Sequence, residues 1–101
     1  METTSVLRKD EWSQLFRLMD NYSRNRLNCL VTEFFLSREK AEYFICFRPL
    51  GVTTIESPNR FACEYVTIAL EEAKKMANDN SLTVDFTAEL DRRLSALGQL
   101  T

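Results

Sequence analysis

Residues 28–48, NCLVTEFFLSREKAEYFICFR, decide the fold of this chain. Their apolar side chains follow a two-residue period on both sides of the polar turn 37–40, which predicts two antiparallel strands. One face of this hairpin then holds eight side chains, of which seven are apolar. The four pairs are Leu36 with Ala41, Phe34 with Tyr43, Thr32 with Ile45, and Leu30 with Phe47. Since a slip of one residue would scramble both faces, the pattern predicts a loop with an even number of residues.

A helix is the alternative interpretation for the first half of this segment. Leu27, Leu30, Val31 and Phe34 also recur at helical spacing. A short apolar run does not by itself separate a strand from a buried helix. A helix therefore remains an alternative to the first strand of the hairpin.

The second face of the predicted hairpin mixes apolar and charged side chains. Its seven central residues are Val31, Glu33, Phe35, Glu42, Phe44, Cys46 and Arg48. A two-stranded hairpin is marginal alone, and three helices do not easily cover both of its faces. An apolar patch with a charged rim is typical of an interface, and pairing across a two-fold axis would remove open strand edges. We therefore expect this face to bind a protein partner or a second copy of the chain.

Three helices are predicted around the hairpin. Residues 9–25 place their apolar side chains on one arc, as an amphipathic helix does. A long helix is expected over 58–78, because Ser57 suits the N-cap and proline suits the first helical position. Its apolar arc is wide enough to touch two neighbours.

The third predicted helix covers about 87–97. Phe86, Leu90, Leu94 and Leu97 recur as one narrow stripe, with Thr87 available as N-cap and Gly98 as C-cap. Residues 82–86 fit either a short strand or an earlier turn of this helix. The prediction is a single α+β domain over residues 1–101: helix, β-hairpin, long helix, a short strand or turn, and a C-terminal helix.

The composition excludes several classes of function. The chain has no histidine and two glycines, neither in a phosphate-binding motif, which removes the commonest general base and metal ligand. Cys29, Cys46 and Cys63 are an odd number without a C-x-x-C pair, so we expect reduced structural thiols. No catalytic residue, metal or cofactor is predicted.

Charge and hydropathy bear on partners and location. The net charge is −2, and acidic residues alternate with the basic residues of the N-terminal half. Because binding to phosphates needs a net positive surface, nucleic acid is not expected as a partner. No apolar run is long enough to cross a bilayer, and the first five residues do not resemble a secretory leader. We expect no membrane association and a cytoplasmic location.

These observations favour a regulatory, non-catalytic protein-binding module: a small inhibitor, adaptor or accessory factor that forms a homodimer through its hairpin. The alternative is a domain that binds a small apolar ligand in an aromatic pocket. That pocket would be lined by Trp12, Phe34, Tyr43, Tyr65 and Glu72. A weaker alternative is an enzyme that uses carboxylate acid–base chemistry.

Overall fold

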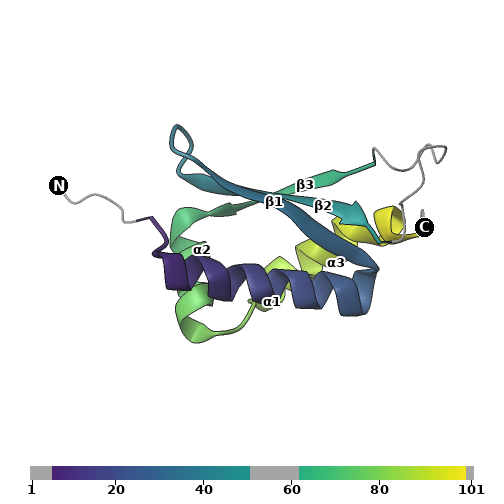
Figure 1. The fold of residues 1–101 in the computed structure, drawn as a ribbon, viewed down its shortest axis with the longest axis horizontal. Helices are drawn as coiled ribbons and strands as arrows, with labels where there is room; N and C mark the ends of the chain where they lie inside the picture. Colours follow the sequence, from purple (N-terminus) through teal and green to yellow (C-terminus); the bar gives the residue numbers. More distant parts are fainter. Residues whose placement is uncertain (1–5, 51–61, 100–101) are drawn as a thin grey trace.

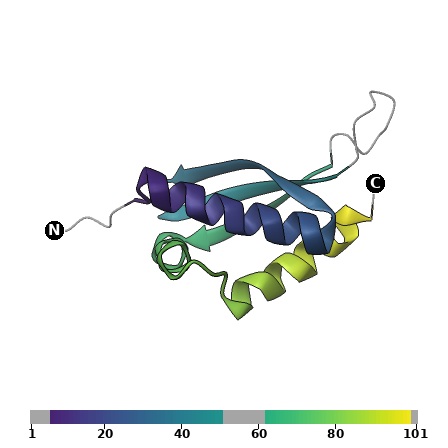
Figure 2. The ribbon, with the colours of Figure 1, turned by 60° about the horizontal axis from the view of Figure 1, so that its bottom comes forward.

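The computed structural model describes residues 6–50 and 62–99. Its elements follow the order α1 (Lys9–Leu27), β1 (Cys29–Ser37), β2 (Glu42–Pro49), β3 (Glu64–Ala69), α2 (Leu70–Asp79) and α3 (Val84–Gly98). The strands form one antiparallel sheet in the order β1-β2-β3. All three helices pack on the same face of this sheet (Figures 1 and 2). The α+β class and the order of helix, hairpin and helices are confirmed.

The loop of the β1–β2 hairpin has four residues, 38–41, as its predicted even length requires. It lies one residue further along the chain than predicted, so Phe34 pairs with Ile45 and Leu36 with Tyr43. Ala41 accounts for the shift, because its φ of 53° places it in the left-handed region and in the turn. The predicted parity holds in this half of the hairpin, where Tyr43 and Ile45 are buried.

A β-bulge inverts the parity in the other half. The register shifts between Val31 and Glu33, so Thr32 is the extra residue of β1. Val31 and Cys29 therefore point into the core, with 5 % and 0 % of their surface exposed. The predicted core positions of Leu30 and Thr32 are wrong: Thr32 is exposed and Leu30 only half-buried.

The long helix predicted over 58–78 is wrong within the described residues. Residues 64–69 form β3, which pairs with β2, and only 70–79 are helical. Val66 and Ile68 are buried whereas Tyr65 and Thr67 are exposed, and this two-residue period is that of a strand. The predicted start of the helix at Ser57 lies outside the described residues.

The helix α3 resolves the alternative left open at 82–86. It begins at Val84, and its N-cap is Thr83 instead of the predicted Thr87, because the Thr83 hydroxyl accepts a hydrogen bond from Phe86 N. Residues 84–86 are therefore an earlier turn of helix. The predicted stripe of Phe86, Leu90, Leu94 and Leu97 is buried. Gly98 is the last helical residue, and Gln99 is the C-cap.

The core lies between the inner face of the sheet and the helices. Its fully buried large side chains come from every layer: Leu15 and Met19 of α1, Ile45 and Phe47 of β2, Val66 of β3, Met76 of α2, and Leu90 and Leu94 of α3. The sheet thus buries one face only, and its other face carries no described helix (Figure 2).

One carboxylate joins α1 to α2 at the edge of this core. Glu11 is 3 % exposed and accepts hydrogen bonds from Arg8 N at 2.9 Å, Asn78 Nδ2 at 2.8 Å and Lys74 Nζ at 3.2 Å. The bond from the Arg8 backbone, followed by those from Asn78 and Lys74, outweighs burial and lowers the pKa of Glu11 to about 2.

Glu11 should make folding sensitive to acid. Its pKa is lowered from 4.5 to about 2 in the folded chain, so its stabilisation is present above pH 4.5 and is lost as pH falls towards 2. The full shift corresponds to on the order of 3 kcal/mol. In urea unfolding at neutral pH, Glu11→Gln should be less stable than the parent, and the difference should shrink by more than half at about pH 3. Glu71→Gln, at an exposed position, is the control for the loss of a charge. If the difference in unfolding free energy between Glu11→Gln and the parent is the same at both pH values, Glu11 does not have this role.

The ends of α1 and α3 meet at Gly98. Asn28, in the left-handed region just after α1, donates from Nδ2 to Gly98 O at 2.8 Å. A Cβ added at Gly98 would lie 1.9 Å from Leu27 O, which belongs to the backbone. The two helix ends can therefore approach this closely only with glycine at position 98.

Gly98→Ala should destabilise the fold although alanine favours helices. Relieving the clash requires the last turn of α3 to move away from α1, at a cost of roughly 1–3 kcal/mol. For a domain of this size, we expect thermal unfolding to occur about 4–20 °C lower. The exposed Ala96→Ser in the same turn should change the midpoint little, and equal midpoints for the two variants would disprove the tight contact.

Candidate protein-interaction face

The outer face of the sheet, which points away from the helices, is the candidate site. Because β1 beyond its bulge, β2 and β3 keep strict alternation, the same side of each strand contributes to it. The residues of this outer face are Glu33, Phe35 and Ser37 of β1, Glu42, Phe44, Cys46 and Arg48 of β2, and Tyr65, Thr67 and Ala69 of β3.

Aromatic side chains form the apolar part of the outer face. Phe35 and Phe44 pair across the hairpin with ring centroids 5.6 Å apart and planes 12° from parallel. Phe35 is 47 % exposed and Tyr65 is 46 % exposed. Exposed aromatic rings of this size are unusual on a surface that meets only water, and they are enriched at protein interfaces.

Charged side chains of both signs surround these rings. Glu33 and Glu42 are acidic, whereas Arg48 and Lys40 are basic. The Lys40 ammonium lies 5.9 Å from the centroid of the Phe44 ring, and Arg48 Nη1 donates to Ala62 O at 3.5 Å. Counting Lys40 of the adjoining turn, two acidic and two basic groups surround the rings.

Six of the seven residues predicted for the mixed face do lie on it. The seventh, Val31, is in the core, because the bulge at Thr32 turns its side chain inward. Cys46 lies on the outer side of β2 but is fully buried among its neighbours, so it offers no surface to a partner.

Sequence reasoning missed the share of this face that comes from β3. The sequence pattern predicts a helix at Tyr65 and Thr67. In the structure, Tyr65 pairs with Cys46 and Thr67 with Phe44 across the sheet. The signal that could have found them is the alternation of residues 64–69, in which β-branched residues are frequent.

The five residues of the predicted aromatic pocket do not share one cavity. Phe34 contacts Trp12 at 5.1 Å and Tyr43 at 5.1 Å between ring centroids. Tyr65 lies on the opposite side of the sheet from Tyr43. Glu72 lies on α2, where it accepts a hydrogen bond from the Thr83 hydroxyl at 3.1 Å.

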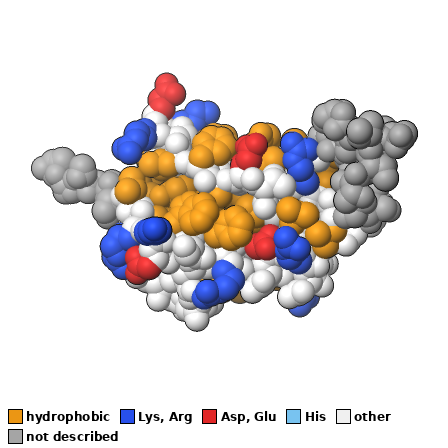
Figure 3. All heavy atoms as spheres, in the orientation of Figure 1, with side chains coloured by type: hydrophobic (Ala, Val, Ile, Leu, Met, Phe, Trp, Pro, Cys, Tyr) orange, Lys and Arg blue, Asp and Glu red, His pale blue; other side chains and the backbone are white. Residues whose placement is uncertain are grey.

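The aromatic contacts continue along the border between α1 and β1. Trp12 also stacks on Phe16, with centroids 5.3 Å apart, and is 36 % exposed. In the space-filling view, hydrophobic side chains gather over this border (Figure 3). We call Trp12, Phe16 and Phe34 the aromatic seam; it lies beside the outer face, across the edge strand β1.

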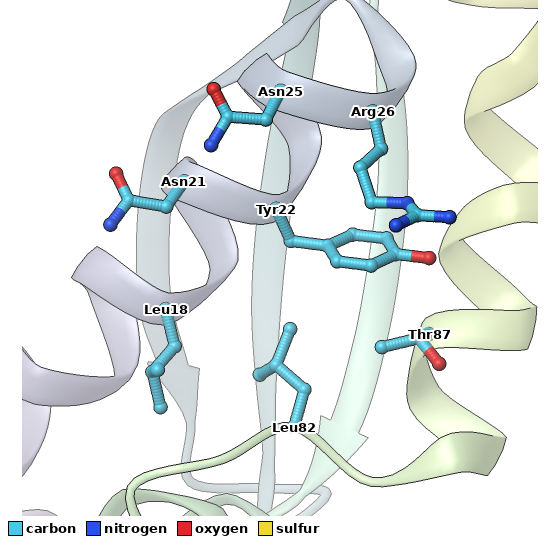
Figure 4. Close-up of a pocket in the computed structure, with 7 residues that line it drawn as sticks. All are labelled: Leu18, Asn21, Tyr22, Asn25, Arg26, Leu82 and Thr87. Atoms are coloured by element: carbon cyan, nitrogen blue, oxygen red, sulfur yellow. The ribbon is translucent and has the colours of Figure 1, made fainter.

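A shallow groove lies on the helical side of the molecule. Its volume is about 390 Å³, and Leu18, Tyr22 and Leu82 contribute its apolar lining (Figure 4). The Tyr22 hydroxyl donates to Asp91 at 2.8 Å, and the Arg26 guanidinium lies 5.5 Å from the Tyr22 ring centroid. Burial and the bond to Asp91 raise the pKa of Tyr22.

Comparison of the chain with models of known protein families, with curated proteins and with solved structures finds no match. In residues 6–50 and 62–99, no helix is long and apolar enough to cross a membrane. Within the same ranges, no three side chains of the cysteine, aspartate or glutamate type come together as a metal site would require. The fold and the outer face thus define a small α+β domain with a one-sided sheet.

Proposed function

We propose that this chain is a non-catalytic protein-interaction module that self-associates through the outer face of its sheet. The observation that carries the proposal is the pair of stacked rings, Phe35 and Phe44, together with Tyr65 on a sheet face that no described helix covers. Roles as an inhibitor, adaptor or accessory factor are compatible with such a module.

The balance of charge favours a second copy as the partner. A face with Glu33 and Glu42 on one hand and Arg48 and Lys40 on the other has the composition of a self-complementary surface. A two-fold axis through such a face can bring acidic groups of one copy near basic groups of the other. A strongly acidic or strongly basic partner would instead select a face of a single sign.

The size of the face predicts weak association. Three strands about 4.8 Å apart, aligned over the six residues of β3 with a rise of about 3.3 Å each, give a footprint of roughly 14 by 20 Å. Stable complexes bury about 800 Å² on each partner. The outer face reaches this only with adjoining surface, and the aromatic seam supplies apolar area beside β1. We therefore expect a dimer that dissociates on dilution.

A charge at the centre of the outer face should abolish association. In Phe44→Glu, a carboxylate would have to be desolvated between the two copies, whereas it is hydrated in the monomer. Light scattering coupled to size exclusion, over a range from about 10 µM to 1 mM, should show a dimer for the parent and a monomer for the variant. Circular dichroism should show the same secondary structure for both.

Val84→Glu is the matched control, because Val84 is 82 % exposed and lies on α3, away from the outer face. It adds the same charge at the first position of a helix, where a carboxylate is favourable. This variant should dimerise like the parent. A parent chain that is monomeric at 1 mM, or equal loss of the dimer in both variants, would rule out the outer face as the self-association surface.

A further inference from the structure

Two of the three cysteines meet on the outer face of the sheet. Cys46 of β2 pairs with Tyr65 of β3, and Cys63 comes two residues before Tyr65. Cys63 directly precedes β3, and continuing the alternation of that strand by one residue places it as a diagonal neighbour of Cys46 on the same side. No local pattern brings these two cysteines together, because they are 17 residues apart and the sequence predicts a helix around residue 63.

The Cys46 thiol lies close enough to Cys63 to raise the pKa of the Cys63 thiol. Cys46 is fully buried, whereas Cys63 is partly exposed. Tyr65 also lies beside Cys46, which raises the pKa of the Tyr65 hydroxyl. The Cys63 thiol can therefore be reached from solvent, and the buried Cys46 thiol lies next to it. An attacking thiol and a resolving thiol require this arrangement.

The backbone around Cys63 allows the two sulfur atoms to come together. A disulfide requires Cβ atoms about 3.5–4.5 Å apart, and diagonal neighbours in a sheet begin somewhat further apart than this. The paired region of β2 and β3 ends at Phe47 and Glu64. Cys63 lies one residue outside it, so it can move towards Cys46 without breaking a pair of the ladder.

We propose that Cys46 and Cys63 form a reversible intramolecular disulfide when the chain meets a small-molecule disulfide such as oxidised glutathione. The Cys63 thiolate attacks one sulfur of glutathione disulfide and displaces the first glutathione thiolate. Cys46 then loses its proton to solvent and attacks the Cys63 sulfur, which displaces the second. The two cysteines together lose two electrons and two protons, and one glutathione disulfide becomes two glutathione thiols.

The surroundings of Cys63 determine the rate of this reaction through the pKa of its thiol. Burial raises the pKa of the Cys63 thiol, Cys46 and Glu33 raise it further, and Arg48 opposes them. The thiolate that attacks is therefore scarce at neutral pH, and the exchange is slow there. Mildly alkaline conditions are suited to the test.

Cys29 provides a control within the same chain. It is fully buried on the inner face of the sheet, its thiol donates to Leu27 O at 3.3 Å, and burial raises its pKa to about 11. It pairs with Pro49 at the start of β1, and its side chain points into the core, away from the outer face. The same oxidant should leave Cys29 reduced.

The test treats the reduced full chain with millimolar oxidised glutathione at about pH 8.5. Remaining thiols are then blocked with N-ethylmaleimide in denaturant, and the chain is measured by intact mass and peptide mapping. We expect one blocked thiol, on Cys29, a disulfide-linked peptide pair containing Cys46 and Cys63, and monomeric migration on a non-reducing gel. Dithiothreitol should restore three blocked thiols.

Two variants distinguish a Cys46–Cys63 disulfide from oxidation at other cysteines. Cys29→Ser should still form the disulfide, whereas Cys63→Ser should instead retain two blocked thiols. Three blocked thiols in the oxidised parent, a disulfide that contains Cys29, or a chain that stops at a mixed disulfide with glutathione would each overturn the proposal. The thiols are measured at a chain concentration of about 1 µM, below the range in which the dimer is expected, so that association of the outer face does not shield Cys63.

Discussion

The position at which β1 joins α1 controls the rest of the structure. Asp20 of α1 accepts a hydrogen bond from Val31 N at 3.0 Å and binds Arg24 at 2.7 Å. This bond satisfies a backbone group of an edge strand and fixes the start of β1 against the helix. The bulge follows at Thr32, whose hydroxyl donates to Cys46 O at 3.2 Å. Together they decide which side of β1 enters the core.

The core then leaves one side of the sheet without cover. Each helix buries its apolar stripe against the inner face, where Ile45 and Phe47 are completely enclosed. Covering the outer face as well would require a further layer, which the described residues do not contain. The rings of Phe35, Phe44 and Tyr65 therefore lie on a surface that no helix of residues 6–50 and 62–99 covers. This one-sidedness underlies both the proposed association and the partial exposure of Cys63.

The part of the fold that depends on local pattern was predictable from sequence. The 3.6-residue period from Lys9 onward gave α1, and the two-residue period around the turn gave the hairpin and the inward side of Phe34 and Ile45. The outer-face positions of Phe35 and Phe44 followed from the same parity, which is why most of the candidate site could be named in advance.

The remainder depended on interactions between segments distant in the sequence. Two hydrogen bonds hold the bulge at Thr32: Val31 N donates to Asp20, 11 residues away, and the Thr32 hydroxyl donates to Cys46 O, 14 residues away. A local sequence pattern therefore does not predict the bulge. In 64–69 the alternation is short, and the alanines that follow favour a helix, so only pairing with β2 makes this segment a strand. The Cys46–Cys63 pair became visible only once that strand was in place.

The contact between Asn28 and Gly98 has a consequence for how the chain folds during synthesis. It joins residues 70 positions apart, and α3 also supplies Leu90 and Leu94 to the core beneath the hairpin. Because a ribosome adds roughly 5–20 residues per second, α1 and the hairpin leave the ribosome several seconds before α3 can cover them. During that interval α1 is the helix that covers part of the inner face, and the area that α3 covers in the folded chain stays exposed. A nascent chain thus leaves part of its apolar inner face exposed, and α3 is the segment that completes the cover of that face.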